Sequence, residues 1–190
     1  MFSTKEMLIK RSGKNKIGRF EFLKQIVSEF KTTNNLEAKQ QVMANLANFA
    51  YDPINYDFLR SLGVIDLFLD QLAENNPTLA QYALGGLCNL VLDSQNKEYV
   101  LANGGVNHIS PYLLSKNDDM VLSAISTLMF LVTPVSKNDI TNDVVIQQML
   151  ELSKNQNQRI SNLAKIFLED YCPRDRVTRI ENLINIPLPS

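Results

Sequence analysis

The sequence has few of the residues from which catalytic and metal sites are usually built. Its 190 residues include no tryptophan, one histidine and two cysteines. Any catalytic triad would have to use His108, and neither Cys88 nor Cys172 has the basic, helix-N-terminal setting that activates a thiol. Two cysteines in apolar helical patterns make neither a disulfide framework nor a zinc site. We therefore expect a protein of a reducing compartment that is not an enzyme and holds no cofactor or metal.

Long apolar runs and nucleotide-binding motifs are also missing. No stretch approaches the roughly 18–20 apolar residues that cross a bilayer. The apolar start around Met7, Leu8 and Ile9 is too short for the core of a signal peptide. There is no glycine-rich phosphate loop and no RNA-recognition signature. We expect a soluble intracellular protein without a membrane segment.

Charge of one sign is scarce overall but unevenly placed. The formal net charge is −1, yet residues 1–19 hold six basic residues against one acidic residue, which leaves −6 on the remainder. This predicts a basic, flexible N-terminal arm over residues 1–17. Such an arm either binds nucleic acid or an import receptor, or is only a solvated tail. If RNA is touched, the candidate phosphate contacts are Lys10, Arg11, Lys14 and Lys16.

A repeat of 41 residues is the strongest positive signal. Leu46, Asn48 and Phe49 recur as Leu87, Asn89 and Leu90, and the frame continues to Leu128, Phe130 and Leu131. Apolar residues recur at spacings of three and four, with no convincing strand alternation. A repeat of this length with helical spacing predicts an all-α fold of the α-solenoid type.

Proline and glycine divide this pattern into short helices. The body over 18–172 therefore contains about three and a half repeats. Pro111 predicts that one second helix is short or kinked. After Pro173, the apolar stripe of Val177 and Ile180 predicts a C-terminal tail over 173–190 that caps the last repeat or docks on a partner. The predicted helices are 18–31, a second ending before 52, 53–61, 64–74, 77–91, 95–102, one ending near 115, 118–132, 137–141, 143–153 and 157–171.

The three-helix cycle resembles the armadillo repeat. The likeness is carried by Leu46-Ala47-Asn48-Phe49-Ala50, Leu87-Cys88-Asn89-Leu90 and the turn Asn103-Gly104-Gly105-Val106. It implies that the third helices line a partner-binding groove, in which Asn48 and Asn89 bond an extended backbone. The alternative is that both asparagines cap carbonyls inside the stack. The spacing i, i+4, i+7 predicts the groove residues Gln41, Asn45, Asn48, Tyr82, Gly86, Asn89, Ser123, Thr127 and Phe130.

Two adjacent glycines, Gly85 and Gly86, lie in the middle of a predicted helix, where each costs on the order of 1 kcal/mol relative to alanine. Either close helix packing or close approach of a partner would explain them.

A denser likeness covers the chain from about Ile17 to its end. The stretches 41–56, 85–90, 121–129 and 162–170 resemble the armadillo repeat-containing protein 7 family, whereas the first sixteen residues and 133–142 differ. The resemblance implies a nuclear, non-enzymatic splicing factor that partners an RNA-recognition-motif protein, as a monomer within a heteromeric complex. It further implies work in the minor spliceosome, which removes U12-type introns, near the capped 5′ end of the U6-type snRNA, with indirect RNA contact. A cytoplasmic armadillo adaptor for extended peptide motifs is the alternative.

Overall fold

The described residues of this computed structural model are 2–4, 6–7, 18–74 and 76–184, and they are helical or irregular with no strand among them. They fall into two compact units, residues 1–103 and 104–190, which we call unit 1 and unit 2. The boundary lies in the predicted glycine turn between Asn103 and Gly104. The basic residues Lys10, Arg11, Lys14 and Lys16 lie outside the described residues.

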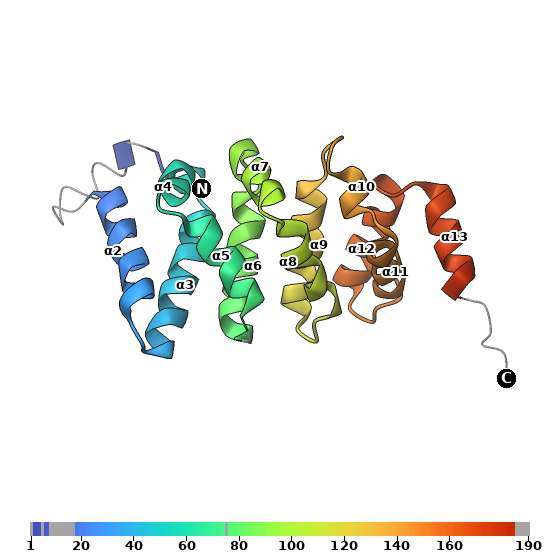
Figure 1. Cartoon of the computed structure of the whole chain (residues 1–190), viewed down its shortest axis with the longest axis horizontal. Coiled ribbons are helices and arrows are strands. Elements are labelled where there is room, and N and C mark those ends of the chain that lie inside the picture. The colour runs from blue at the N-terminus through green and yellow to red at the C-terminus, as the bar shows by residue number, and fades with distance from the viewer. Residues whose placement is uncertain (1, 5, 8–17, 75, 185–190) are drawn as a thin grey trace. The chain divides into compact units, whose positions relative to one another are not determined.

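Unit 1 is built around a pair of long helices, α3 and α6, that pack on each other (Figure 1). Helix α2 packs against α3, and α5 packs against α6. The predicted helices are confirmed to within about one residue at the ends that were specified. The elements of this unit are α2 (Arg19–Thr32), α3 (Leu36–Ala50), η1 (Pro53–Asn55), α4 (Tyr56–Ser61), α5 (Val64–Ala73), α6 (Pro77–Leu90) and α7 (Ser94–Ala102).

Unit 2 repeats the plan, with α9 packed on η2 and α12, and α11 packed on α12. Its second helix changes from α to 3₁₀ geometry at Ser110, one residue before Pro111, so the predicted shortening is confirmed. Proline lacks the N–H that would continue an α-helix. The elements are α8 (Gly105–Ile109), η2 (Ser110–Leu114), α9 (Asp118–Leu131), α10 (Lys137–Ile140), α11 (Asp143–Leu152), α12 (Gln158–Asp170) and α13 (Arg174–Ile184).

The third helix of each repeat begins at an asparagine. In every case the side-chain oxygen accepts a hydrogen bond from a backbone N–H of the first helical turn, which would otherwise lack a partner. The successive caps are 41, 41 and 40 residues apart, so they carry the same period as the core. The capping residues are Asn35, Asn76, Asn117 and Asn157.

The core positions of the repeat are fully buried. Leu46, Leu87 and Leu128 are each 0% exposed, which confirms the core half of the predicted frame. Gly63 and Gly104 have φ angles of 68° and 71° and end the first helices of their repeats. An L-residue with a side chain rarely adopts this left-handed conformation, so glycine is required at both turns.

The C-terminal helix α13 packs against α11 in unit 2. Ile180 is buried there, and the guanidinium groups of Arg176 and Arg179 each lie 2.7 Å from a carboxylate oxygen of Asp143 at the start of α11. Leu183 and Ile184 stay exposed, so only part of the predicted apolar stripe is covered.

Candidate partner-binding ridge

Three predicted groove residues lie on one side of α3. Gln41 and Asn48 are exposed and Asn45 is half-buried, and the Gln41 Nε2 donates to the Asn45 Oδ1 at 3.2 Å. The side chain of Asn48 makes no hydrogen bond within the part of the chain that the structure describes. Its amide therefore has two donor hydrogens and an acceptor oxygen available to a partner.

Helix α6 carries Tyr82 and Asn89, both half-buried, on the neighbouring helix of unit 1. The backbone oxygen of Asn89 accepts from the Tyr56 hydroxyl at 3.0 Å, which fixes the end of α6. The Asn89 side chain, like that of Asn48, has no hydrogen bond among the described residues. Capping of carbonyls inside the stack is done by other asparagines, Asn55 and Asn96.

Gly86 does not face this side, and its assignment to the groove is wrong. A Cβ built on Gly86 would lie 2.4 Å from Cε2 of Phe68, a buried residue of α5. The glycine is therefore required because the Phe68 ring occupies the space of a side chain. At Gly85, in contrast, a Cβ would meet nothing within 4 Å. We call the residues Gln41, Asn45, Asn48, Tyr82 and Asn89 the unit 1 ridge.

The three predicted residues of unit 2 behave differently. Thr127 is fully buried, and its Oγ1 donates to the Ser123 backbone oxygen at 2.6 Å, so its assignment to an open groove is wrong. A threonine hydroxyl in a helix commonly bonds the carbonyl four residues back. Ser123 is half-buried, and Phe130 is 41% exposed. Unit 2 thus offers an aromatic ring without the neighbouring amides.

An aromatic cluster near the start of α2 was missed from the sequence. Phe22 and Phe49 lie 5.8 Å apart between ring centroids, and the Arg19 guanidinium lies 4.9 Å from the Phe49 centroid. Phe2 packs on Tyr51 at 5.5 Å. Such pairs join α2 to the end of α3, and they stabilise the edge of unit 1 beyond the burial of apolar area. Their spacing in the sequence follows no single helical face, which is why the pattern gave no signal.

Chemistry at a nucleophile or metal finds no support among residues 2–4, 6–7, 18–74 and 76–184. They contain no group of three His, Cys, Asp or Glu side chains placed to hold a metal ion. Burial raises the pKa of the Cys172 thiol to about 11, so at neutral pH it is almost wholly protonated and a poor nucleophile. Within the same residues, the helices are too short or too polar to cross a membrane.

No family model matches the chain. Among solved structures, computationally designed armadillo repeat proteins for modular peptide recognition match it with a TM-score of 0.73, over 87% of this chain and 71% of theirs, at 11% identity. A designed armadillo repeat protein in complex with the peptide (KR)4 matches with a TM-score of 0.69, over 84% of this chain and 69% of its own, at 9% identity. At such identities the likeness establishes the fold alone. The chain is an armadillo-type α-solenoid protein, a class of protein-binding scaffolds.

A curated relative defines the family more narrowly. Armadillo repeat-containing protein 7 of Mus musculus is 48% identical over 180 residues, which cover 91% of this chain and 91% of the mouse protein. The chain belongs to the armadillo repeat-containing protein 7 family.

Proposed function

We propose that this protein is a non-enzymatic scaffold that binds an RNA-recognition-motif protein through the unit 1 ridge and acts with it in pre-mRNA splicing. The observation that carries the proposal is the pair Asn48 and Asn89, whose side-chain amides have no hydrogen-bond partner among the described residues. They lie one repeat apart on helices that pack directly on each other. Family membership supports the cellular role, which is work in the nucleus on U12-type introns.

The chemistry of the ridge favours recognition of a backbone. Each asparagine amide can donate to a carbonyl and accept from an N–H of an extended partner segment. Tyr82 supplies an aromatic surface beside them, of the kind that anchors many interfaces. None of the five ridge side chains is charged at neutral pH, so this contact should depend little on salt.

RNA recognition, in this proposal, belongs to the partner. The complex would lie in the minor spliceosome near the capped 5′ end of the U6-type snRNA, and the scaffold would touch RNA only through its basic arm. There Lys10, Arg11, Lys14 and Lys16 would contact phosphates, which add affinity without sequence specificity.

The test is affinity purification of the tagged full chain from nuclear extract, with proteins and RNAs identified in the eluate. We expect one RNA-recognition-motif protein and a U6-type snRNA. The double variant Asn48→Ala/Asn89→Ala should recover about tenfold less of both, since each lost hydrogen bond is worth about 0.5–1.5 kcal/mol. Asn182→Ala, an exposed asparagine on α13, is the matched control. Recovery of neither partner nor RNA with the unaltered chain would overturn the proposal.

The alternative, a cytoplasmic adaptor for extended peptides, also uses Asn48 and Asn89 and gives a different result. It requires that a short linear peptide from the recovered partner bind alone with the full affinity of the partner. If binding needs the folded domain, the adaptor is excluded and the dedicated scaffold stands.

A further inference from the structure

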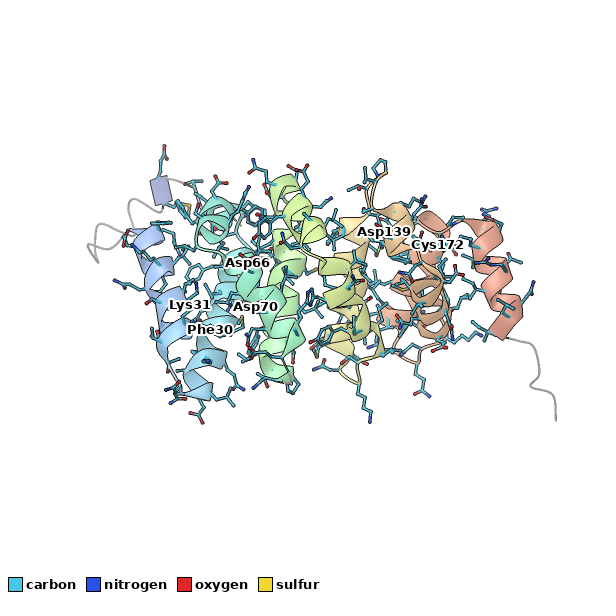
Figure 2. The ribbon with its side chains drawn as sticks, in the orientation of Figure 1. Phe30, Lys31, Asp66, Asp70, Asp139 and Cys172 are labelled. Atoms are coloured by element: carbon cyan, nitrogen blue, oxygen red, sulfur yellow. The ribbon has the colours of Figure 1, made fainter. Side chains whose placement is uncertain are left out.

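A second surface of unit 1 has features of a binding site that the ridge does not use. A cleft of about 580 Å³ lies between α5 on one wall and α2 and α3 on the other. Figure 2 labels Asp66 and Asp70 on the α5 wall, and Phe30 and Lys31 on α2 opposite. The third acidic residue of the cleft, Glu74, follows the end of α5. We call this space the acidic cleft.

The three carboxylates of the acidic cleft are exposed and carry no ion pair within the described part of the chain. Asp66 accepts a hydrogen bond from the Tyr99 hydroxyl at 2.7 Å, which holds it at the mouth of the cleft. The lysines on the opposite wall do not neutralise them, because Lys39 directs its ammonium to the Phe30 ring, 5.4 Å from the centroid. The negative charge on the α5 wall is therefore available to a ligand.

A buried amide gives an independent indication that a ligand is missing. Gln71 lines the same cleft and is only 5% exposed, yet its Oε1 accepts no hydrogen bond from any described residue. A buried acceptor without a donor costs on the order of 1–3 kcal/mol. Such a cost is offset when a ligand brings an N–H to the amide. The site therefore calls for a donor as well as a positive charge.

The spacing of the acids selects an extended chain over a single metal ion. Asp66, Asp70 and Glu74 follow one another at intervals of four residues, which corresponds to about 6 Å along a helix axis for each step. They do not converge on one point, in keeping with the absence of a three-ligand metal group among the described residues. In an extended peptide, alternate side chains are about 6.6 Å apart. Every second residue of such a peptide would meet one carboxylate.

We propose that the acidic cleft binds an extended, arginine-containing segment of a protein partner, with basic side chains at alternate positions against Asp66, Asp70 and Glu74. A guanidinium N–H completes the site by donating to Gln71 Oε1. Arginine is favoured over lysine because its planar group can bond a carboxylate with two N–H groups and still donate elsewhere. Lys31 and Lys39, on the far wall, face the carbonyl oxygens of the segment. This site is separate from the ridge and does not rest on the splicing role.

The experiment measures binding of labelled synthetic peptides to the full chain by fluorescence anisotropy. The probes are Arg-Thr-Arg-Thr-Arg, the same peptide with lysine, and the same peptide with glutamate. We expect the arginine peptide to bind best and the glutamate peptide not to bind. The triple variant Asp66→Asn/Asp70→Asn/Glu74→Gln should weaken arginine-peptide binding by about tenfold or more, as expected for loss of several charge-assisted hydrogen bonds.

A charge-matched control separates a site from general attraction. Glu98→Gln/Glu151→Gln/Glu169→Gln removes three exposed carboxylates outside the cleft and should change the affinity by less than about twofold. Gln71→Met keeps the volume but removes the acceptor, and should abolish the preference for arginine over lysine. Equal losses in the two triple variants, or no preference for arginine in the unaltered chain, would overturn the proposal.

Backbone amide shifts keep the result interpretable if a variant folds poorly. Titration of the unaltered chain with the arginine peptide should move resonances of α5 and the end of α2, and leave the unit 1 ridge unmoved. Shifts confined to the ridge would contradict the acidic cleft. Since Asn48→Ala should not affect this titration, failure of the cleft and failure of the ridge are distinguishable.

Discussion

Asn55 and Asn96 lie 41 residues apart and make the same buried hydrogen bond. Each donates from its side-chain Nδ2 to the carbonyl six residues earlier, Phe49 at 2.9 Å and Leu90 at 3.1 Å. Both side chains are almost fully buried, 2% and 0% exposed. The accepting carbonyls belong to the last turns of α3 and α6, where carbonyls lack helical partners. The amide thus joins the end of one repeat to the start of the next.

The first prediction concerns this repeated bond. Asn55→Ala and Asn96→Ala should each lower the free energy of unfolding by about 1–3 kcal/mol, because a buried carbonyl loses its donor. Urea denaturation followed by circular dichroism measures the change. Asn48→Ala on the exposed face should stay within about 0.5 kcal/mol. Equal effects of Asn48 and Asn55 would mean that the buried amide has no structural role.

A second prediction separates the two adjacent glycines. Gly86→Ala should destabilise the protein by about 1–3 kcal/mol, since the new methyl group would overlap the Phe68 ring. Gly85→Ala should stabilise it by up to about 1 kcal/mol, because alanine is the better helix former and nothing lies near its Cβ. Thermal unfolding of the two variants checks the opposite signs. A stabilised Gly86→Ala would show that the Phe68 contact is absent in solution.

The third prediction is a dependence on pH at the C-terminal helix. The hydrogen bond from Arg176, with a further contribution from Arg179, holds the pKa of Asp143 below its usual 3.8, against a small opposing effect of burial. A carboxyl with a lowered folded pKa contributes stability that is present above 3.8 and is lost as the pH falls through the folded value. Hydrogen exchange of α13 should therefore accelerate relative to the rest of unit 2 below about pH 4.

Two variants test the assignment to Asp143. Asp143→Asn should give fast exchange of α13 already at pH 7 and remove the dependence on acid. Asp170→Asn, at the exposed end of α12, should leave both unchanged. An acid-labile α13 in the Asp143→Asn protein would assign the effect to other groups.

A fourth prediction follows from the burial of Cys172. With a pKa of about 11 and a buried thiol, Cys172 should react slowly with a disulfide reagent at pH 8 in a Cys88→Ser background. Denaturant should accelerate the reaction to the rate of a free thiol. Rapid reaction in the native protein would mean that the packing around the end of α12 is open.

The sequence predicted the fold well because the repeat is encoded locally. Leu46, Leu87 and Leu128 mark the core, and Pro77 and Pro111 mark boundaries that proline chemistry imposes. The asparagine caps such as Asn76 carried the same period and were overlooked, although they begin every third helix. Local rules of this kind need no knowledge of the tertiary contacts.

The candidate site was less predictable because it depends on which direction each side chain takes. A shift of one residue turns a helix by about 100°. That shift separates Gly86, packed on Phe68, from the open Gly85, and the sequence spacing could not decide between them. The acidic cleft joins α2 to α5 across more than thirty residues. Its acids look like an ordinary solvated helix face until the facing wall is known.

The most direct test of the ridge as a partner-binding surface is site-specific photocrosslinking in nuclear extract. A photoreactive residue is placed at position 41, exposed on the ridge, or at position 151, exposed on α11 as the control. Our account predicts that an RNA-recognition-motif protein is crosslinked from position 41 and not from position 151. A protein that copurifies with the chain but crosslinks only from position 151 would contradict it.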